Sequence, residues 1–135
     1  MDLMDSRAIS AAGMRVQGER LRVISENIAN ADSVSEVRGG DPYRRKTITF
    51  QNELDRQSGL DLVKVKKVGL DPSEFTRKYD PSNPAADNQG YVKLPNVNAL
   101  IEMSDMREAQ RSYEANLKVV EVARGMLQRT IDILR

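Results

Sequence analysis

The sequence lacks cysteine, histidine and tryptophan altogether. Without cysteine the chain has neither a thiol nucleophile nor a disulfide, and without histidine it has no imidazole base and no common nitrogen ligand for zinc. Because these absences remove most catalytic and metal chemistry, we expect a protein that is not an enzyme and that carries no cofactor. The composition does not indicate a reducing or an oxidising compartment, since a chain without cysteine behaves alike in both.

An excess of charge of one sign is also lacking, because 21 Lys and Arg residues face 20 Asp and Glu residues. So balanced a chain has no general attraction to nucleic acid or to an anionic membrane. The charged N-terminus is followed by no apolar run as long as a signal peptide or a membrane span. We therefore expect no nucleic-acid partner, no membrane insertion, and an export route that uses no cleaved signal peptide.

The five prolines and several of the glycines lie between Gly39 and Pro95. Because these residues interrupt regular helices, their distribution predicts a helix at each end of the chain and an irregular β region between them. We divide the chain into an N-terminal helix (residues 1–32), a β-containing insertion (residues 33–95) and a C-terminal helix (residues 96–135). The expected fold is mainly α, with the two terminal helices paired in a coiled-coil-like inner layer.

The middle of the chain contains four short strand candidates. β-branched residues alternate loosely with Arg, Lys and Thr at residues 43–50 and 60–68, which favours two strands there. Residues 75–79 and 91–94 are two further candidates. The prolines, together with Asp and Asn residues, indicate turns and an extended connector before the last helix.

A heptad pattern marks the N-terminal helix, which Asp5 or Ser6 can cap and which can continue to about Ala31. Its large apolar residues recur at spacings of three, four or seven, as in a coiled-coil seam. The predicted intramolecular seam on this helix comprises Met14, Leu21, Ile24 and Ile28.

The C-terminal helix, which Asn96 or Asn98 can cap, has two apolar stripes instead of one. The first stripe is the predicted counterpart of the intramolecular seam and comprises Tyr113, Leu117, Val120, Leu127, Ile131 and Leu134. The second stripe comprises Ala115, Val119, Val122, Met126 and Ile133. At about 100° of rotation per residue, the two stripes lie roughly 140° apart around the helix.

A second apolar stripe implies a second partner for the C-terminal helix. A helix in an ordinary two-layer domain needs only one apolar stripe, and the N-terminal helix can cover only one of the two. We therefore predict that the second stripe is an interface between subunits of a larger assembly. The alternative is that the helical pair docks on the β region, which would then cover the second stripe inside the chain.

Several motifs resemble those of the bacterial flagellar rod and hook axial proteins. The first is SENIANADS at residues 25–33, where the Asn-Ile-Ala-Asn element closes the N-terminal helix in that family. DPSNPAAD at residues 80–87, GYVKLPNV at residues 90–97 and RSYEAN at residues 111–116 are more specific, and together they resemble the proximal-rod C type over essentially the whole chain. Most relatives follow the first element with a Thr and a Gly-Tyr or Gly-Phe pair, which residues 33–42 lack, as the proximal type does.

The resemblance implies a structural subunit of a tubular rod whose inner layer is built from paired terminal helices. It implies location in the flagellar basal body, in the periplasm, after export by the flagellar type III apparatus. Its implied partners are other copies of the chain, proximal and distal rod proteins, and membrane-ring and adaptor proteins at the rod base. The competing class is a small soluble helical adaptor or export chaperone that binds a single partner through its exposed stripe.

Two amides at the end of the N-terminal helix are further interface candidates. Asn27 and Asn30 can both donate and accept hydrogen bonds, and the small Ala29 beside them allows close approach of another helix. For Asn30 the alternative is local capping, in which its amide bonds nearby backbone as the helix ends. The basic groups around Arg45 and Lys66 have acidic neighbours, so we expect a solvated or interfacial strand face there.

Overall fold

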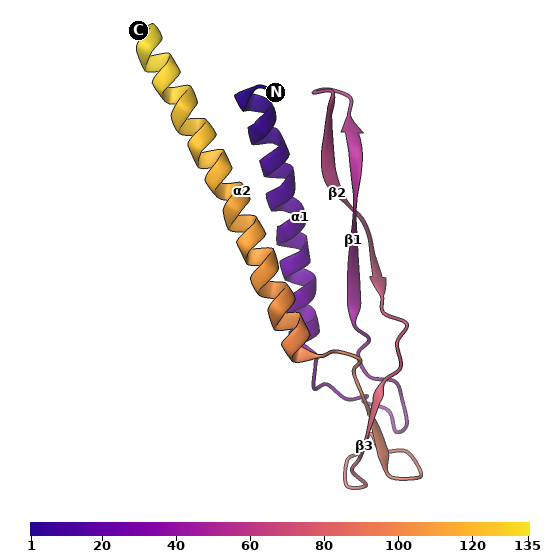
Figure 1. The fold of residues 1–135 in the computed structure, drawn as a ribbon. Helices are drawn as coiled ribbons and strands as arrows, with labels where there is room; N and C mark the ends of the chain where they lie inside the picture. Colours follow the sequence, from indigo (N-terminus) through magenta and orange to yellow (C-terminus); the bar gives the residue numbers. More distant parts are fainter. The chain divides into compact units, whose positions relative to one another are not determined.

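The structure is a computed structural model that describes residues 1–135. Its elements follow the order α1 (Leu3–Ala29), β1 (Lys46–Asp55), β2 (Leu60–Leu70), β3 (Thr76–Tyr79), β4 (Tyr91–Leu94) and α2 (Ala99–Leu134). Two long terminal helices pack together, and two β-hairpins form the insertion between them (Figure 1), which confirms the predicted fold class. Neither helix contains an apolar stretch of the length that crossing a bilayer requires.

The helix starts show which polar residues act as caps. At α2 the Asn98 side chain accepts hydrogen bonds from the backbone N–H groups of Leu100 and Ile101, at 3.1 and 3.4 Å, as predicted. At α1 the predicted caps are wrong, because the helix begins at Leu3 and Asp2 precedes it. The Asp5 carboxylate instead accepts the Asp2 backbone N–H at 3.0 Å, the reciprocal half of a capping box.

Both hairpins have only two strands, and all four strands lie within or close to the predicted segments. β3 and β4 are antiparallel, with Tyr79 opposite Tyr91 and their rings in edge-to-face contact at 5.3 Å between centroids. Gly90 adopts a φ of 84°, and a side chain there would lie 3.0 Å from the Tyr79 ring. This hairpin has a small apolar core of Ala85, Ala86 and Val92.

The contacts of the chain form two compact units. The first comprises Met1–Leu21, Ile48–Lys67 and Arg107–Arg135, and the second comprises Arg22–Thr47 and Val68–Met106. Each unit contains part of α1 and part of α2, so each has its own piece of the helix pair.

In the first unit small side chains line the contact between the helices. The most buried apolar residues there are Ala12 and Val16 on α1 and Ala109 and Ala123 on α2. Gly13 allows a close approach, because a Cβ at that position would lie 2.8 Å from the Asn116 amide nitrogen. The absence of a side chain at Gly13 therefore has a structural reason that offsets its cost in helix propensity, about 1 kcal/mol relative to Ala.

Candidate assembly surface and the polar cluster

A charged side chain is fully buried at the start of α2. Glu102 has no exposed surface, and its carboxylate accepts hydrogen bonds from Arg45 Nε and, at 3.3 Å, from Asn27 Nδ2. Arg45 also lies 3.4 Å from Asp71 and 3.9 Å from Asp105. Burial alone would lower the pKa of the Arg45 guanidinium, but the hydrogen bond to Glu102 and the charges of Glu102 and Asp71 raise it above its usual range. The ion pair therefore favours the charged form of the Arg45 guanidinium inside the unit.

Asn27 joins the end of α1 to the segment that leads into β1. Its side-chain oxygen accepts the Tyr43 hydroxyl at 2.7 Å and the Lys46 backbone N–H at 2.9 Å. Its side-chain nitrogen donates to the Lys46 carbonyl at 2.9 Å and to Glu102. Since the residue is only 1 % exposed, the structure places all the hydrogen bonds of this amide inside the chain.

Asn96 plays a similar part in the connector before α2. Its side-chain oxygen accepts the Arg45 backbone N–H at 2.8 Å, and its nitrogen donates to the carbonyls of Asp71 and Ser73, both at 3.1 Å. The Ser73 backbone N–H in turn holds the pKa of Asp71 below its usual range. We call this set of residues the polar cluster: Asn27, Tyr43, Arg45, Asp71, Asn96, Glu102 and Asp105.

The basic residues around Arg45 also form hydrogen bonds and ion pairs within the chain. Arg44 donates from Nη1 to the carbonyls of Asp71 and Ser73 at 2.8 and 2.9 Å and stacks 4.3 Å from the centre of the Phe75 ring. Lys46 pairs with Glu26 at 2.8 Å, and this hydrogen bond lowers the pKa of Glu26 and raises that of Lys46. The basic group therefore supports the fold of the second unit.

Asn30 takes part in the hydrogen bonds that end α1. Its side-chain nitrogen donates to the Glu26 carbonyl at 2.9 Å, and its own carbonyl accepts the Ser33 hydroxyl at 2.9 Å. This geometry matches the capping alternative.

The predicted intramolecular seam becomes more exposed toward the C-terminus. Ile24 is buried, and a half-buried group comprises Met14, Leu21, Ile28, Tyr113, Val120 and Leu127. Leu117, Ile131 and Leu134 are 37 %, 50 % and 81 % exposed. Beside the exposed Leu117, its neighbour Asn116 is half-buried and packs beside Gly13, and Ala123 is buried.

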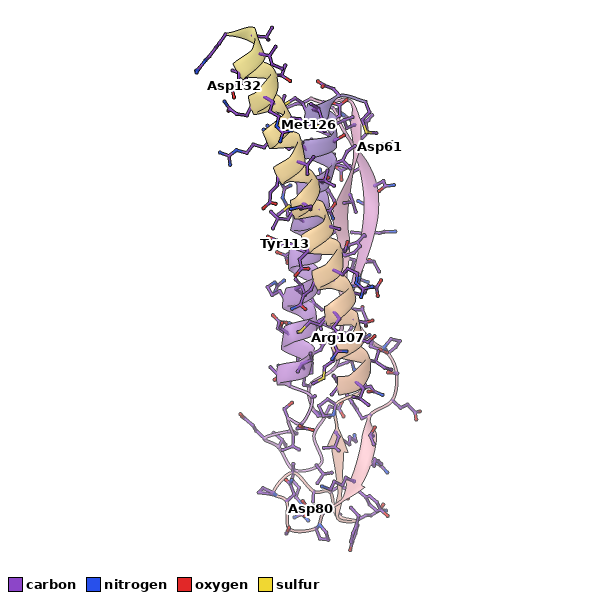
Figure 2. The ribbon with its side chains drawn as sticks, turned by 60° about the vertical axis from the view of Figure 1, so that its left-hand side comes forward. Asp61, Asp80, Arg107, Tyr113, Met126 and Asp132 are labelled. Atoms are coloured by element: carbon purple, nitrogen blue, oxygen red, sulfur yellow. The ribbon has the colours of Figure 1, made fainter.

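The second stripe is exposed throughout. Ala115, Val119, Val122, Met126 and Ile133 all lie on the surface, with exposed fractions of 44 to 48 % for the middle three and 83 % for Ile133. Figure 2 shows Met126 and Tyr113 on α2, and Asp132 on turns that extend past the first turn of α1. The chain therefore leaves an apolar face of α2 uncovered, as a subunit interface requires.

Sequence reasoning missed the acidic half of the polar cluster. Glu102 lies four residues before Met106 and seven before Ala109, so it occupies a seam position of α2. A carboxylate at such a position needs a buried cation, and this was the available signal. Arg45, 57 residues earlier, could not be chosen as that cation from any local pattern.

Comparison with known proteins indicates the class of protein to which this chain belongs. The family described as "Flagellar basal body rod FlgEFG protein C-terminal" matches residues 88–133, which include most of α2. The fold with two paired terminal helices and this match together define a flagellar rod protein, a structural component in motility.

Three relatives narrow the class to one family, and all are named flagellar basal-body rod protein FlgC. The protein of Agrobacterium fabrum is 58 % identical over 94 % of this chain and 91 % of its own length. That of Salmonella typhimurium is 38 % identical over 98 % of both chains, and that of Bacillus subtilis is 36 % identical over 98 % of this chain and 99 % of its own. The chain therefore belongs to the FlgC family, and it is a structural rod subunit and not an enzyme.

Proposed function

We propose that the chain assembles in the periplasm into the proximal part of the flagellar rod, a helical tube that transmits torque from the membrane ring to the distal rod and hook. Its partners in this proposal are further copies of itself, the other proximal and distal rod proteins, and membrane-ring and adaptor proteins at the rod base. The flagellar type III apparatus exports it without a cleaved signal peptide. The membership of the FlgC family supports the location, and the exposed second stripe of α2 supports the assembly.

The second stripe carries the proposal because its side chains have no cover within the chain. Val119, Val122 and Met126 follow one another at spacings of three and four, so they form a continuous strip along the helix. Each is close to half exposed. Burying such side chains against a neighbour contributes roughly 1 kcal/mol or more apiece, which a charge in the same place would reverse.

The test places a charge in the stripe and a matched charge beside it. We expect Val122→Asp to abolish swimming while export of the subunit continues, because the carboxylate would be buried without a partner at the subunit contact. Gln110→Asp, an exposed position on the same helix outside both stripes, should swim normally. Leu127→Asp should also block assembly, but for a different reason, because its charge would disrupt the half-buried contact between α1 and α2 inside the chain. Normal swimming of the Val122→Asp strain would show that the second stripe is not an interface.

A further inference from the structure

A hollow beside the hairpin of β3 and β4 (Figure 1) has three cations in its wall. Its volume is about 510 Å³, and the cations are Arg44, Arg77 and Lys93. Lys93 pairs with Asp41 at 3.0 Å. Arg44 donates its hydrogen bonds only to backbone carbonyls, and Arg77 forms neither a hydrogen bond nor an ion pair within the chain. Glu74, the second acidic residue of the wall, pairs with neither of them, so two guanidinium groups at the hollow lack a carboxylate partner.

The register of the hairpin places two of these cations directly opposite each other. Arg77 of β3 faces Lys93 of β4, and Tyr79 faces Tyr91 in the same way. Like charges at facing positions of two strands repel each other and destabilise the pair. Asp41 offsets the charge of Lys93 alone, so an anion bound from outside the chain would relieve the remaining repulsion.

The outer edge of β3 has free backbone groups next to these cations. The Asp80 N–H donates to the Gly90 carbonyl at 2.9 Å, and hydrogen-bonded positions alternate along an antiparallel pair. The N–H and C=O groups of Arg77 and Tyr79 therefore point away from β4. No hydrogen bond within the chain uses them.

The edge of β4 is closed at the equivalent position. The Tyr91 carbonyl accepts the Asp87 N–H at 2.9 Å, and the Tyr91 N–H donates to the Asp87 carboxylate at 3.0 Å. On β3, in contrast, all four residues from Thr76 to Tyr79 are exposed. A free strand edge accepts an extended peptide as a further strand. Cations along such an edge oppose pairing with another basic edge and favour an acidic one.

We propose that an extended acidic segment of another protein adds to the free edge of β3 as a third strand. Alternate side chains of a strand share one face, so acidic residues at every second position of that segment would lie on the face of Arg77 and Lys93. Their carboxylates would enter the hollow and pair with the guanidinium groups of Arg77 and Arg44. This docking site goes beyond the proposed function and does not depend on it.

A second copy of this chain does not fit the site. Glu53 and Asp55 are its only acidic residues two positions apart. Both are bonded inside the hairpin of β1 and β2, Glu53 to Lys64 at 2.8 Å and Asp55 to the Ser58 hydroxyl at 2.7 Å. The acidic segment therefore belongs to a different protein.

Peptide binding to the purified full chain tests the proposal. The probe is a fluorescein-labelled octapeptide of alternating glutamate and threonine, because threonine favours the extended conformation, and binding is followed by fluorescence anisotropy. We expect Arg77→Gln to weaken binding at least about tenfold, and added salt to weaken binding to the parent chain. Lys78→Gln is the matched control, because it removes the same charge from the next exposed residue on the opposite face of β3, and it should bind like the parent. Equal losses in the two variants, or no binding to the parent, would overturn the proposal.

Two N-methylated forms of the probe test the strand pairing itself. Methylation of every second residue removes one of the two alternate rows of N–H groups, and only the row that faces β3 forms hydrogen bonds. One form should therefore lose binding and the other should keep it, whereas equal binding of both would overturn the added strand. An oligogalacturonate of equal charge serves as a glycan probe. If it binds more tightly than the peptide and displaces it, the hollow recognises an anionic sugar and the proposed peptide is wrong.

Discussion

The polar cluster and the helix contact of the first unit hold their segments together by different means. In the cluster, Asn27, Arg45 and Glu102 meet through hydrogen bonds with defined partners and distances. In the first unit, α1 and α2 meet through small residues such as Ala12, Ala109 and Ala123, which bury little apolar area each. The cluster can therefore define one geometry by itself. The helix contact, in contrast, gains stability when neighbouring molecules in an assembly cover the outer faces of the helices.

Breaking the ion pair should have the largest effect on the stability of the chain. Arg45→Met leaves Glu102 buried without its cation, and removing one partner of such a pair typically costs about 3–5 kcal/mol. Urea unfolding of the purified chain, followed by circular dichroism, measures the loss. The double variant Arg45→Met with Glu102→Leu removes both charges and should recover most of the stability. A single variant as stable as the parent would show that the cluster does not stabilise the fold.

Removing the amide of Asn27 should cost less than breaking the ion pair. Asn27→Leu keeps the branched shape of the side chain but leaves the Tyr43 hydroxyl and the Lys46 backbone groups without their partner, a loss of about 2–3 kcal/mol. Asn30→Leu is the control, because that residue is only partly buried and its side chain donates one hydrogen bond, to the Glu26 carbonyl. The same unfolding experiment should place the Asn30 variant within about 1 kcal/mol of the parent. Equal losses in the two variants would contradict the central position of Asn27.

The sequence predicts the elements of this fold well because their signals are local. Apolar spacing identifies both helices, and the distribution of proline and of β-branched residues locates the strands. The Asn98 cap follows from its position just before the helix. Each of these signals lies within a few residues of the structure that it predicts.

The sequence predicts the contacts less well. A pattern with spacings of three and four does not determine which of two neighbouring residues in each turn of a helix faces the other helix. On α2 the spacing of the seam predicts that Leu117 is buried, and seven residues later the same spacing falls on Arg124. The structure instead buries their neighbours Asn116 and Ala123 more deeply. For Asn116 the reason is the close approach of the helices at Gly13, where a flat amide fits better than leucine. The polar cluster was missed for a different reason, since its members come from four segments that no sequence pattern connects.

Substitutions at two glycines of α1 test the close packing of the helix contact. Gly13→Val would bring its side chain against the Asn116 amide, and overpacking of this kind costs about 1–3 kcal/mol. Gly18→Ala is the matched change, since no atom lies within 4 Å of the added group, and it should stabilise the helix by about 0.5–1 kcal/mol. Thermal unfolding of both variants should therefore shift in opposite directions. Shifts of the same sign would mean that the helices are not in close contact at Gly13.

The smallest expected effect concerns the pH dependence contributed by Glu26, at the edge of the second unit. The Lys46 ammonium lowers the pKa of Glu26 in the folded chain, so the pair stabilises the fold above the usual carboxyl range. This contribution is lost as the pH falls through the lowered pKa, because protonation of Glu26 removes the attraction. At the other limit, the raised pKa of Lys46 means that the contribution is lost as the pH rises through that value.

Glu26→Gln should therefore be less stable than the parent at neutral pH, and the difference should vanish in acid. Urea unfolding midpoints measured from neutral pH to below the carboxyl range follow this difference. Lys46→Met should give the same convergence with the parent in acid. The double variant should be no less stable than Glu26→Gln, because that change alone removes both the pair with Lys46 and the pair of Glu26 with Arg22, at 3.0 Å. A difference between Glu26→Gln and the parent that persists unchanged in acid would mean that Glu26 acts through packing and not through its charge. Because both side chains are about a third exposed, salt should reduce the effect, which distinguishes this pair from the buried pair of Arg45 and Glu102.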